Sequence, residues 1–147
     1  MKTQNLKLIA SSEDDLRVIS AHLQDSIVSP LDIASLKKSR ILLIQLNRFM
    51  WEDVEKGVFR KNKRIRTVLK FDNVASVSSK NISQKNNKRF LDFLAIESNE
   101  MLDKSYEIDL IFSGDAILKI KTEVIEVTLD DQGSPWDSKT KPKHKFL

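Results

Sequence analysis

The chain has 147 residues, of which 40% are hydrophobic and 31% are charged, and its formal net charge is +4. This balance is typical of one soluble globular domain and excludes a disordered chain. The sequence contains no cysteine, which excludes disulfides, thiolate catalysis and cysteine-bound metal clusters. With three glycines and two histidines it has no glycine-rich phosphate loop and no dinucleotide fingerprint, so we expect no cofactor and no bound metal.

A short strand and a helix are predicted first. Residues 6–9 alternate in the manner of a strand. Ser11 or Ser12 is placed to cap a helix whose first turn is acidic, which suits the positive end of the helix dipole. Pro30 disfavours helical backbone before it, so the helix should end within residues 25–28. The apolar residues of this helix recur at spacings of three and four and predict one buried stripe: Leu16, Ile19 and Leu23.

The most apolar run of the chain, residues 41–51, predicts a central strand. The run is too short to span a membrane as a helix, and its β-branched and aromatic residues favour a strand over a buried helix. Alternation places Leu42, Ile44 and Leu46 on one face, and the other face is also largely apolar. A turn at residues 37–39 is expected to join this strand to a preceding one as a hairpin.

Every later periodic segment is predicted to be β structure. Asp72 and Asn73 mark a bend, and residues 113–115 have the length of a tight hairpin loop. Near Val124 the apolar residues switch from even-numbered to odd-numbered positions, as expected if the strand contains a bulge or a corner there. The strands predicted after the central one are residues 65–71, 74–79, 90–97, 106–112 and 117–129.

These elements predict an α+β fold with a single domain over residues 1–131 and an irregular tail over residues 132–147. The N-terminal helix should pack on a curled antiparallel sheet, or partly closed barrel, of about six or seven strands in meander order. A pleckstrin-homology-like barrel is the nearest known shape, although its helix stands at the other end of the chain. In the tail, Trp136 is either an anchor docked on the domain or an exposed recognition arm. We favour docking, because a large aromatic usually buries much of its area.

Charge is segregated along the chain. Residues 56–90 hold eleven basic residues and one acidic residue, net +10, and residues 91–138 hold three basic and twelve acidic, net −9. The basic segment either binds nucleic acid by counterion release or pairs, around residues 64–70, with acidic strands at 92–97 or 107–109. We favour pairing, because no stacking-aromatic RNA motif or recognition helix accompanies the patch. The candidate nucleic-acid contacts are Lys61, Lys63, Arg64 and Arg66.

A site for catalysis has one candidate, the pair His22 and Asp25. At a spacing of three residues they would share a helix face and place a carboxylate beside a base. A lone histidine beside an apolar stripe more often hydrogen-bonds a neighbouring strand or turn, and no second cluster supplies further metal ligands. Glu52 and Asp53 are adjacent at a strand end, where such carboxylates usually point apart and are solvated. We therefore predict no catalytic residue and no metal ligand.

Four segments resemble an uncharacterised family of small, mostly alphaproteobacterial proteins of unknown function. The segments are LKLIA at residues 6–10, SAHLQD at 20–25, LNRFMWE at 46–52 and GSPW at 133–136. The resemblance spans nearly the whole chain and implies a bacterial cytoplasmic protein of one domain. It implies no activity, cofactor or partner.

The sequence as a whole predicts a small, non-enzymatic, cytoplasmic binding or protein-interaction module with a protein partner. Nucleic-acid binding through the basic segment 56–70 is the first alternative, and an enzyme centred on His22 and Asp25 is the second. No membrane association is expected, because no run of about 18 apolar residues exists. The oligomeric state is not predicted.

Overall fold

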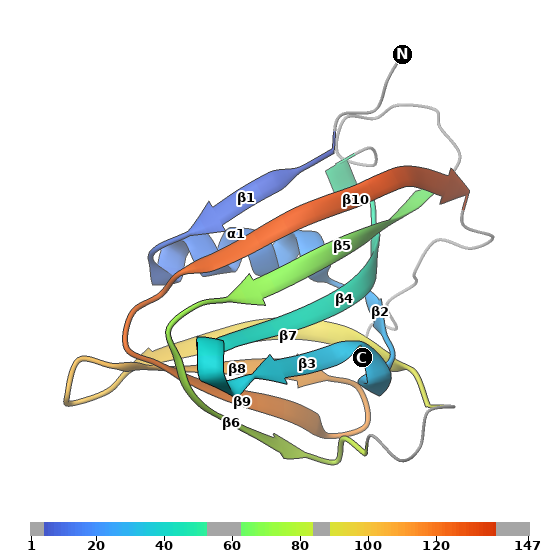
Figure 1. Ribbon diagram of the computed structural model, residues 1–147. Coiled ribbons are helices and arrows are strands. Elements are labelled where there is room, and N and C mark those ends of the chain that lie inside the picture. The colour runs from blue at the N-terminus through green and yellow to red at the C-terminus, as the bar shows by residue number, and fades with distance from the viewer. Residues whose placement is uncertain (1–4, 53–62, 84–88, 138–147) are drawn as a thin grey trace, which may run out of the picture.

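The computed structural model describes residues 5–52, 63–83 and 89–137 (Figure 1). It is a single α+β domain in which one α-helix accompanies an antiparallel sheet, as predicted. The sheet has ten strands, more than the predicted six or seven, and it is not closed into a barrel. The elements are β1 (Lys7–Ala10), α1 (Glu13–Leu23), β2 (Ile27–Val28), η1 (Pro30–Asp32), β3 (Ile33–Leu36), η2 (Lys37–Ser39), β4 (Ile41–Phe49), β5 (Lys63–Phe71), β6 (Val74–Lys80), β7 (Leu91–Glu100), β8 (Tyr106–Phe112), β9 (Ala116–Thr122) and β10 (Val127–Asp137).

The strand order is β1-β10-β5-β4-β2-β7-β8-β9-β6, with β3 paired beside this path to β4. The predicted meander is therefore wrong outside the runs β3-β4-β5 and β7-β8-β9. The last strand, β10, enters between β1 and β5, where Leu129 is the Cα partner of both Leu8 and Leu69. This position buries Leu129 in the core and covers two strand edges at once.

A bend separates β5 from β6 and sends the chain from one layer of the sheet to the other (Figure 1). Asn73 has a positive φ of 58°, a conformation that asparagine tolerates better than most residues, and its side chain donates to Glu126 at 2.7 Å. After the bend, β6 pairs with β9 and no longer follows β4. The predicted bend at Asp72 and Asn73 is confirmed.

Helix α1 begins at the predicted cap. The Ser12 side chain accepts a hydrogen bond from the Asp15 backbone N–H at 3.2 Å. The apolar stripe of α1 is buried in one core with the inner face of β4, and α1 packs against β7, β1 and β4, so the predicted packing of the helix on the sheet is confirmed. In the described part of the chain, no helix is long and apolar enough to cross a membrane. The shared core includes Leu16, Ile19, Leu23, Ile44 and Leu46.

Two predictions about the C-terminal third need correction. The strand predicted over residues 117–129 is two strands, because the chain crosses between layers at residues 123–126; of the two predicted alternatives near Val124, it is the corner and not the bulge that is present. β10 then continues to Asp137 along β5, so the first residues of the segment predicted as an irregular tail are in the sheet. A register shift with Gly133 at φ 70° accommodates the glycine and proline there. Trp136 lies in this strand and is 41% exposed.

Candidate functional site

His22 and Asp25, the predicted helix pair, lie at the C-terminal end of α1 but do not share a helix face. The helix ends at Leu23, Gln24 is extended with ψ 131°, and Asp25 has a positive φ of 65°. Asp25 therefore lies beyond the helix, and the spacing of three residues no longer brings its side chain to the helix face that carries His22. The Nδ1 atom of His22 is buried with no hydrogen-bond partner among the described residues, so the predicted bond is not formed at that atom.

One indole and one guanidinium join the end of α1 to the neighbouring strands. Trp51 donates from Nε1 to the carbonyl oxygen of Gln24 at 2.8 Å. Arg64 donates from Nη1 to the carbonyl oxygens of Asp25 and Asn47, each at 3.1 Å. Burial lowers the pKa of Arg64, and the nearby carboxylate of Asp25 opposes that shift. These contacts give Arg64 a structural role, holding the end of the helix against β4.

Arg48 of β4 is fully buried and binds two carboxylates. It donates to Asp131 from Nε at 2.8 Å and from Nη2 at 2.6 Å, and to Glu52 from Nη1 at 2.9 Å and Nη2 at 2.8 Å. Asp131 also accepts from the backbone N–H of Leu6 at 2.9 Å. Burial alone would lower the pKa of Arg48, but the hydrogen bonds to Asp131 and Glu52 outweigh it and raise that pKa. The charge of Arg48 is neutralised within the fold and is not offered to a ligand.

Glu52 is therefore not the solvated carboxylate that the sequence predicted. Burial would raise the pKa of Glu52, but the hydrogen bonds and charge of Arg48 lower it on balance, and His22 acts in the same direction. Asp53, its predicted companion, lies outside the described residues. Across residues 5–52, 63–83 and 89–137, no three or more histidine, aspartate or glutamate side chains are grouped to hold a metal ion.

The predicted basic patch is divided among different environments. Lys61 lies outside the described residues, and Lys63 lies 3.6 Å from Asp137 of β10. Arg64 is turned inward, as described above, whereas Arg66 is exposed beside a small cavity of about 40 Å³. The predicted pairing with β7 or β8 is wrong, because β5 lies between β4 and β10 and faces the acids of β10 instead. No continuous basic surface is formed by the described members of this patch.

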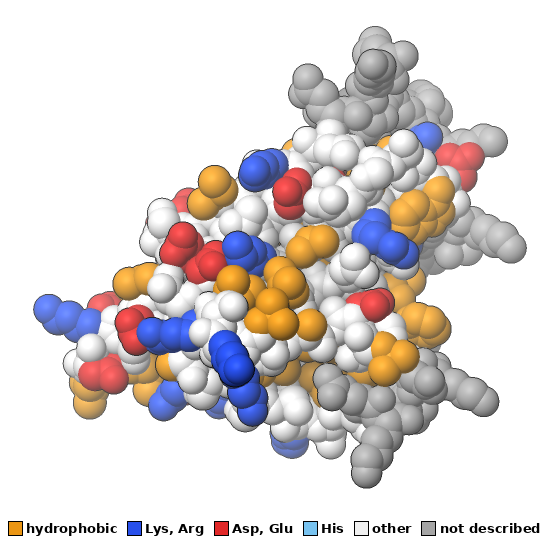
Figure 2. All heavy atoms as spheres, viewed as in Figure 1, with side chains coloured by type: hydrophobic (Ala, Val, Ile, Leu, Met, Phe, Trp, Pro, Cys, Tyr) orange, Lys and Arg blue, Asp and Glu red, His pale blue; other side chains and the backbone are white. Residues whose placement is uncertain are grey.

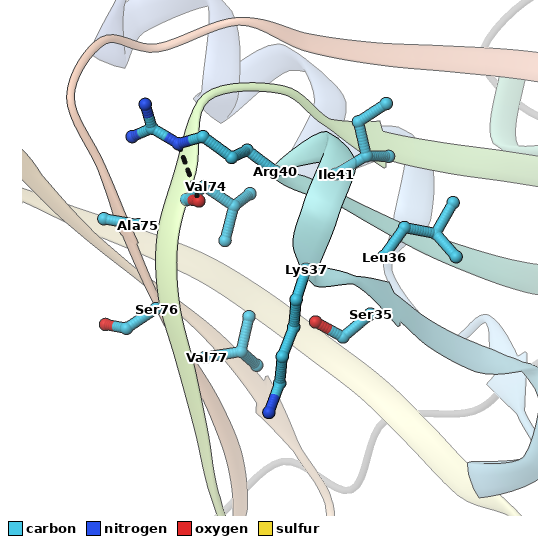
Figure 3. Close-up of a pocket in the computed structure, with 9 residues that line it drawn as sticks. All are labelled: Ser35, Leu36, Lys37, Arg40, Ile41, Val74, Ala75, Ser76 and Val77. Carbon is cyan, nitrogen blue, oxygen red and sulfur yellow. Dashed lines mark hydrogen bonds between the residues drawn. The ribbon is translucent and has the colours of Figure 1, made fainter.

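A groove separates the edges of β3 and β6. Among the described strands, β3 pairs with β4 alone and β6 with β9 alone. β6 begins beside the connection from β3 to β4: the Val74 backbone N–H donates to the Arg40 carbonyl oxygen at 2.9 Å, and Arg40 Nε donates to the Val74 carbonyl oxygen at 3.4 Å. From this point β3 and β6 diverge (Figure 3). Two adjoining cavities of about 450 and 500 Å³, which share Ser35 and Val77, occupy the space between them. We call this space the edge groove.

The edge groove has an apolar floor and a polar, basic rim. Its floor reaches core residues of both layers, and its charged lining residues are Lys37 and Arg40. Hydrophobic side chains also gather on the face beside it, over β3 and β4 (Figure 2), where Leu36 is 45% exposed. The floor is formed by Ile33, Leu42, Val77, Ile82 and Leu118, and the serines that line the groove are Ser35, Ser76, Ser78, Ser79 and Ser83.

The sequence did not predict this groove. Whether a strand lies at the edge of a sheet depends on the order of all the strands, and the residues of one strand do not reveal it. The available signal was weak. Residues 74–80 read as a strand with only two large apolar residues, Val74 and Val77, and three serines, a composition typical of a strand with one exposed side.

The chain matches one family model, and the match covers residues 6–144. The family is described as a protein of unknown function, DUF2948. No curated protein matches the chain. Two of the segments that carry the resemblance to an uncharacterised family, residues 20–25 and 46–52, meet at the hydrogen bond between Trp51 and Gln24. The resemblance to a family of unknown function is confirmed, and the protein belongs to the DUF2948 family.

Proposed function

We propose that this protein is a non-enzymatic, cytoplasmic binding module that holds a segment of a partner protein in the edge groove. One observation carries the proposal: two strand edges, each paired on one side only among the described strands, face each other across a groove with an apolar floor. Exposed strand edges invite pairing and are normally covered or shortened. A groove of several hundred Å³ also falls in the size range of ligand sites.

The polar clusters elsewhere support a binding role over a catalytic one. Arg48 and Arg64 are occupied by carboxylates or backbone carbonyls, and Asp25 is outside the helix that was to align it with His22. A general base must reach a substrate proton together with an orienting partner, and these residues are arranged to join elements of the fold instead. An enzyme centred on His22 and Asp25 is therefore the weaker proposal.

Nucleic-acid binding is also the weaker proposal for the described residues. Lys63 is close to Asp137, Lys70 lies 3.6 Å from Asp72, and Arg64 is half-buried. Phosphate binding by counterion release requires several free cations on one surface. Of the predicted contacts that the structure describes, Arg66 alone is exposed.

The test uses a phage-displayed library of random linear peptides of about ten residues. Ser35→Tyr would fill the groove, because Ser35 is exposed and lines both cavities. Ala34→Tyr is the matched control, since Ala34 directly precedes Ser35 in β3, is exposed and does not line the groove. We expect enriched peptides to bind the unmodified protein and Ala34→Tyr but not Ser35→Tyr.

Thermal melting of both variants shows whether the fold is intact, and Ser78→Tyr on the opposite wall provides a second block of the groove. Enrichment of no peptide, or binding that survives both groove variants, would overturn the proposal.

A further inference from the structure

We infer that the segment bound in the edge groove is an extended, acidic strand of the partner, which pairs with the strand edges that face the groove and places a carboxylate on Lys37. This inference rests on the proposed function and names the chemistry of the occupant.

The walls of the groove favour an extended backbone. In an antiparallel pair, every second residue of an edge strand turns its N–H and C=O away from its partner strand. β6 contributes residues 74–79 to the lining, about 20 Å of strand at roughly 3.3 Å per residue. A segment of about five or six residues in β conformation would match that length and pair with backbone groups that have no strand partner among the described residues.

The floor favours an alternating side-chain pattern in the occupant. A strand in the groove would turn every second side chain toward the floor and the others toward solvent. Leu42 and Leu118 of that floor belong to the core, and Val77 packs against it. Small or medium apolar residues at alternate positions would therefore extend the core of the protein into the groove.

Charge decides which polar residues the occupant carries. The two cavities are lined by two cations, Lys37 and Arg40, and by no carboxylate. Arg40 is held by Glu123 at 2.6 Å, whereas Lys37 has no ion-pair partner among the described residues. Its side chain extends between Ser35 and Val77, along the groove (Figure 3). An ammonium group in this position is complementary to a carboxylate on the occupant.

The test analyses the peptides selected from the random library in the experiment above. We expect them to be richer in aspartate and glutamate than the library, and to lose about tenfold in affinity for Lys37→Glu. Lys38→Glu is the matched control, because it makes the same charge change one residue away, at an exposed lysine that does not line the groove. Methylation of alternate peptide amides should weaken binding in either phase of the alternation, since a strand between two edges turns one set of N–H groups to β3 and the other set to β6.

Failure of the inference is distinguishable from failure of the proposed function. Peptides that bind through the groove but show no excess of acidic residues, or bind Lys37→Glu normally, would overturn the acidic occupant and leave the groove as a site. Insensitivity to amide methylation would overturn strand pairing. A concentration-dependent dimer in sedimentation that is lost in Ser35→Tyr would overturn the inference in favour of a second copy of the chain. Selection of no groove-dependent peptide would overturn the proposed function itself.

Discussion

Arg48 of β4 and Asp131 of β10 form a two-point buried ion pair across the intervening strand β5, with Nε 2.8 Å from Oδ1 and Nη2 2.6 Å from Oδ2. The residue of β5 in register with Asp131 is Thr67, a small side chain. The side chains of Arg48 and Asp131 are both 0% exposed. The pair therefore fixes the register of β10 relative to β4, although 83 residues separate them in sequence.

Replacing Arg48 should be among the most damaging single changes. Arg48→Met would leave Asp131 and Glu52 buried or half-buried without their cation, at a cost on the order of 3–5 kcal/mol in the free energy of unfolding. Urea denaturation measures the loss. Arg17→Met is the control, because the pair of Arg17 with Asp14 is exposed and should contribute less than about 1 kcal/mol. Equal losses in the two variants would contradict the role of Arg48.

The Glu52 carboxylate should make part of the stability depend on pH. Its folded pKa is lowered below the ordinary 4.5, so its contribution is present above that value and is lost as pH falls through the folded pKa. Glu52→Gln should cost on the order of 1–3 kcal/mol near neutral pH, and the difference from the unmodified protein should shrink in acid. Denaturation at a series of pH values measures this. Glu100→Gln, at an exposed glutamate, is the control for the substitution and should change the stability near neutral pH much less than Glu52→Gln.

The central strand shares one buried core with the helix. Leu46 is 2% exposed, and Leu46→Ala should cost on the order of 2–5 kcal/mol through lost burial and a residual cavity. Leu36→Ala, at a side chain 45% exposed, is the comparison and should cost much less. A neutral Leu46→Ala in denaturant melts would show that the packing of α1 on β4 is wrong.

The basic segment should not bind nucleic acid strongly. We expect no micromolar binding of single- or double-stranded nucleic acid at about 150 mM salt, measured by fluorescence anisotropy. The expectation would be contradicted by micromolar binding whose affinity falls steeply as the salt concentration rises and is weaker in the Lys61/Lys63 double variant, with an unchanged melting temperature. That result would favour the nucleic-acid alternative.

His22 should not hold a metal ion. Titration of the pure protein with zinc, nickel or manganese, followed by calorimetry, should give no stoichiometric binding, because no group of ligands surrounds His22 among the described residues. Stoichiometric binding that disappears in His22→Ala would contradict this expectation.

Local patterns predicted several elements correctly. Ser12 caps α1, residues 37–39 connect the hairpin of β3 and β4, and residues 113–115 connect β8 and β9. Each of these depends on residues close in sequence. The change in apolar alternation near Val124 marks the corner that was one of its two predicted causes, where the chain crosses between layers. The pleckstrin-homology-like shape stays a prediction.

Long-range partners were not predictable in the same way. Arg48 reads as one charged residue in an apolar strand, and only β10 beside β5 brings Asp131 to it. Of the two acidic strands chosen as partners for β5, β7 pairs with β2 and β8, and β8 pairs with β9, where Lys119 Nζ lies 2.8 Å from Glu107 Oε1. Opposite charges attract whichever strands carry them, so charge alone does not select a neighbour.

By itself, the sequence determined the helix, the central strand, most turns and the α+β class, because capping, periodicity and turn chemistry act within a few residues. The tertiary structure decided the strand order, the continuation of β10 and the edge groove between β3 and β6. Antiparallel strands of similar composition pair almost equally well in isolation. The strand order that forms is the one that buries the apolar faces of both layers of the sheet in one core. An unpaired edge, and with it the candidate binding site, exists only after that choice.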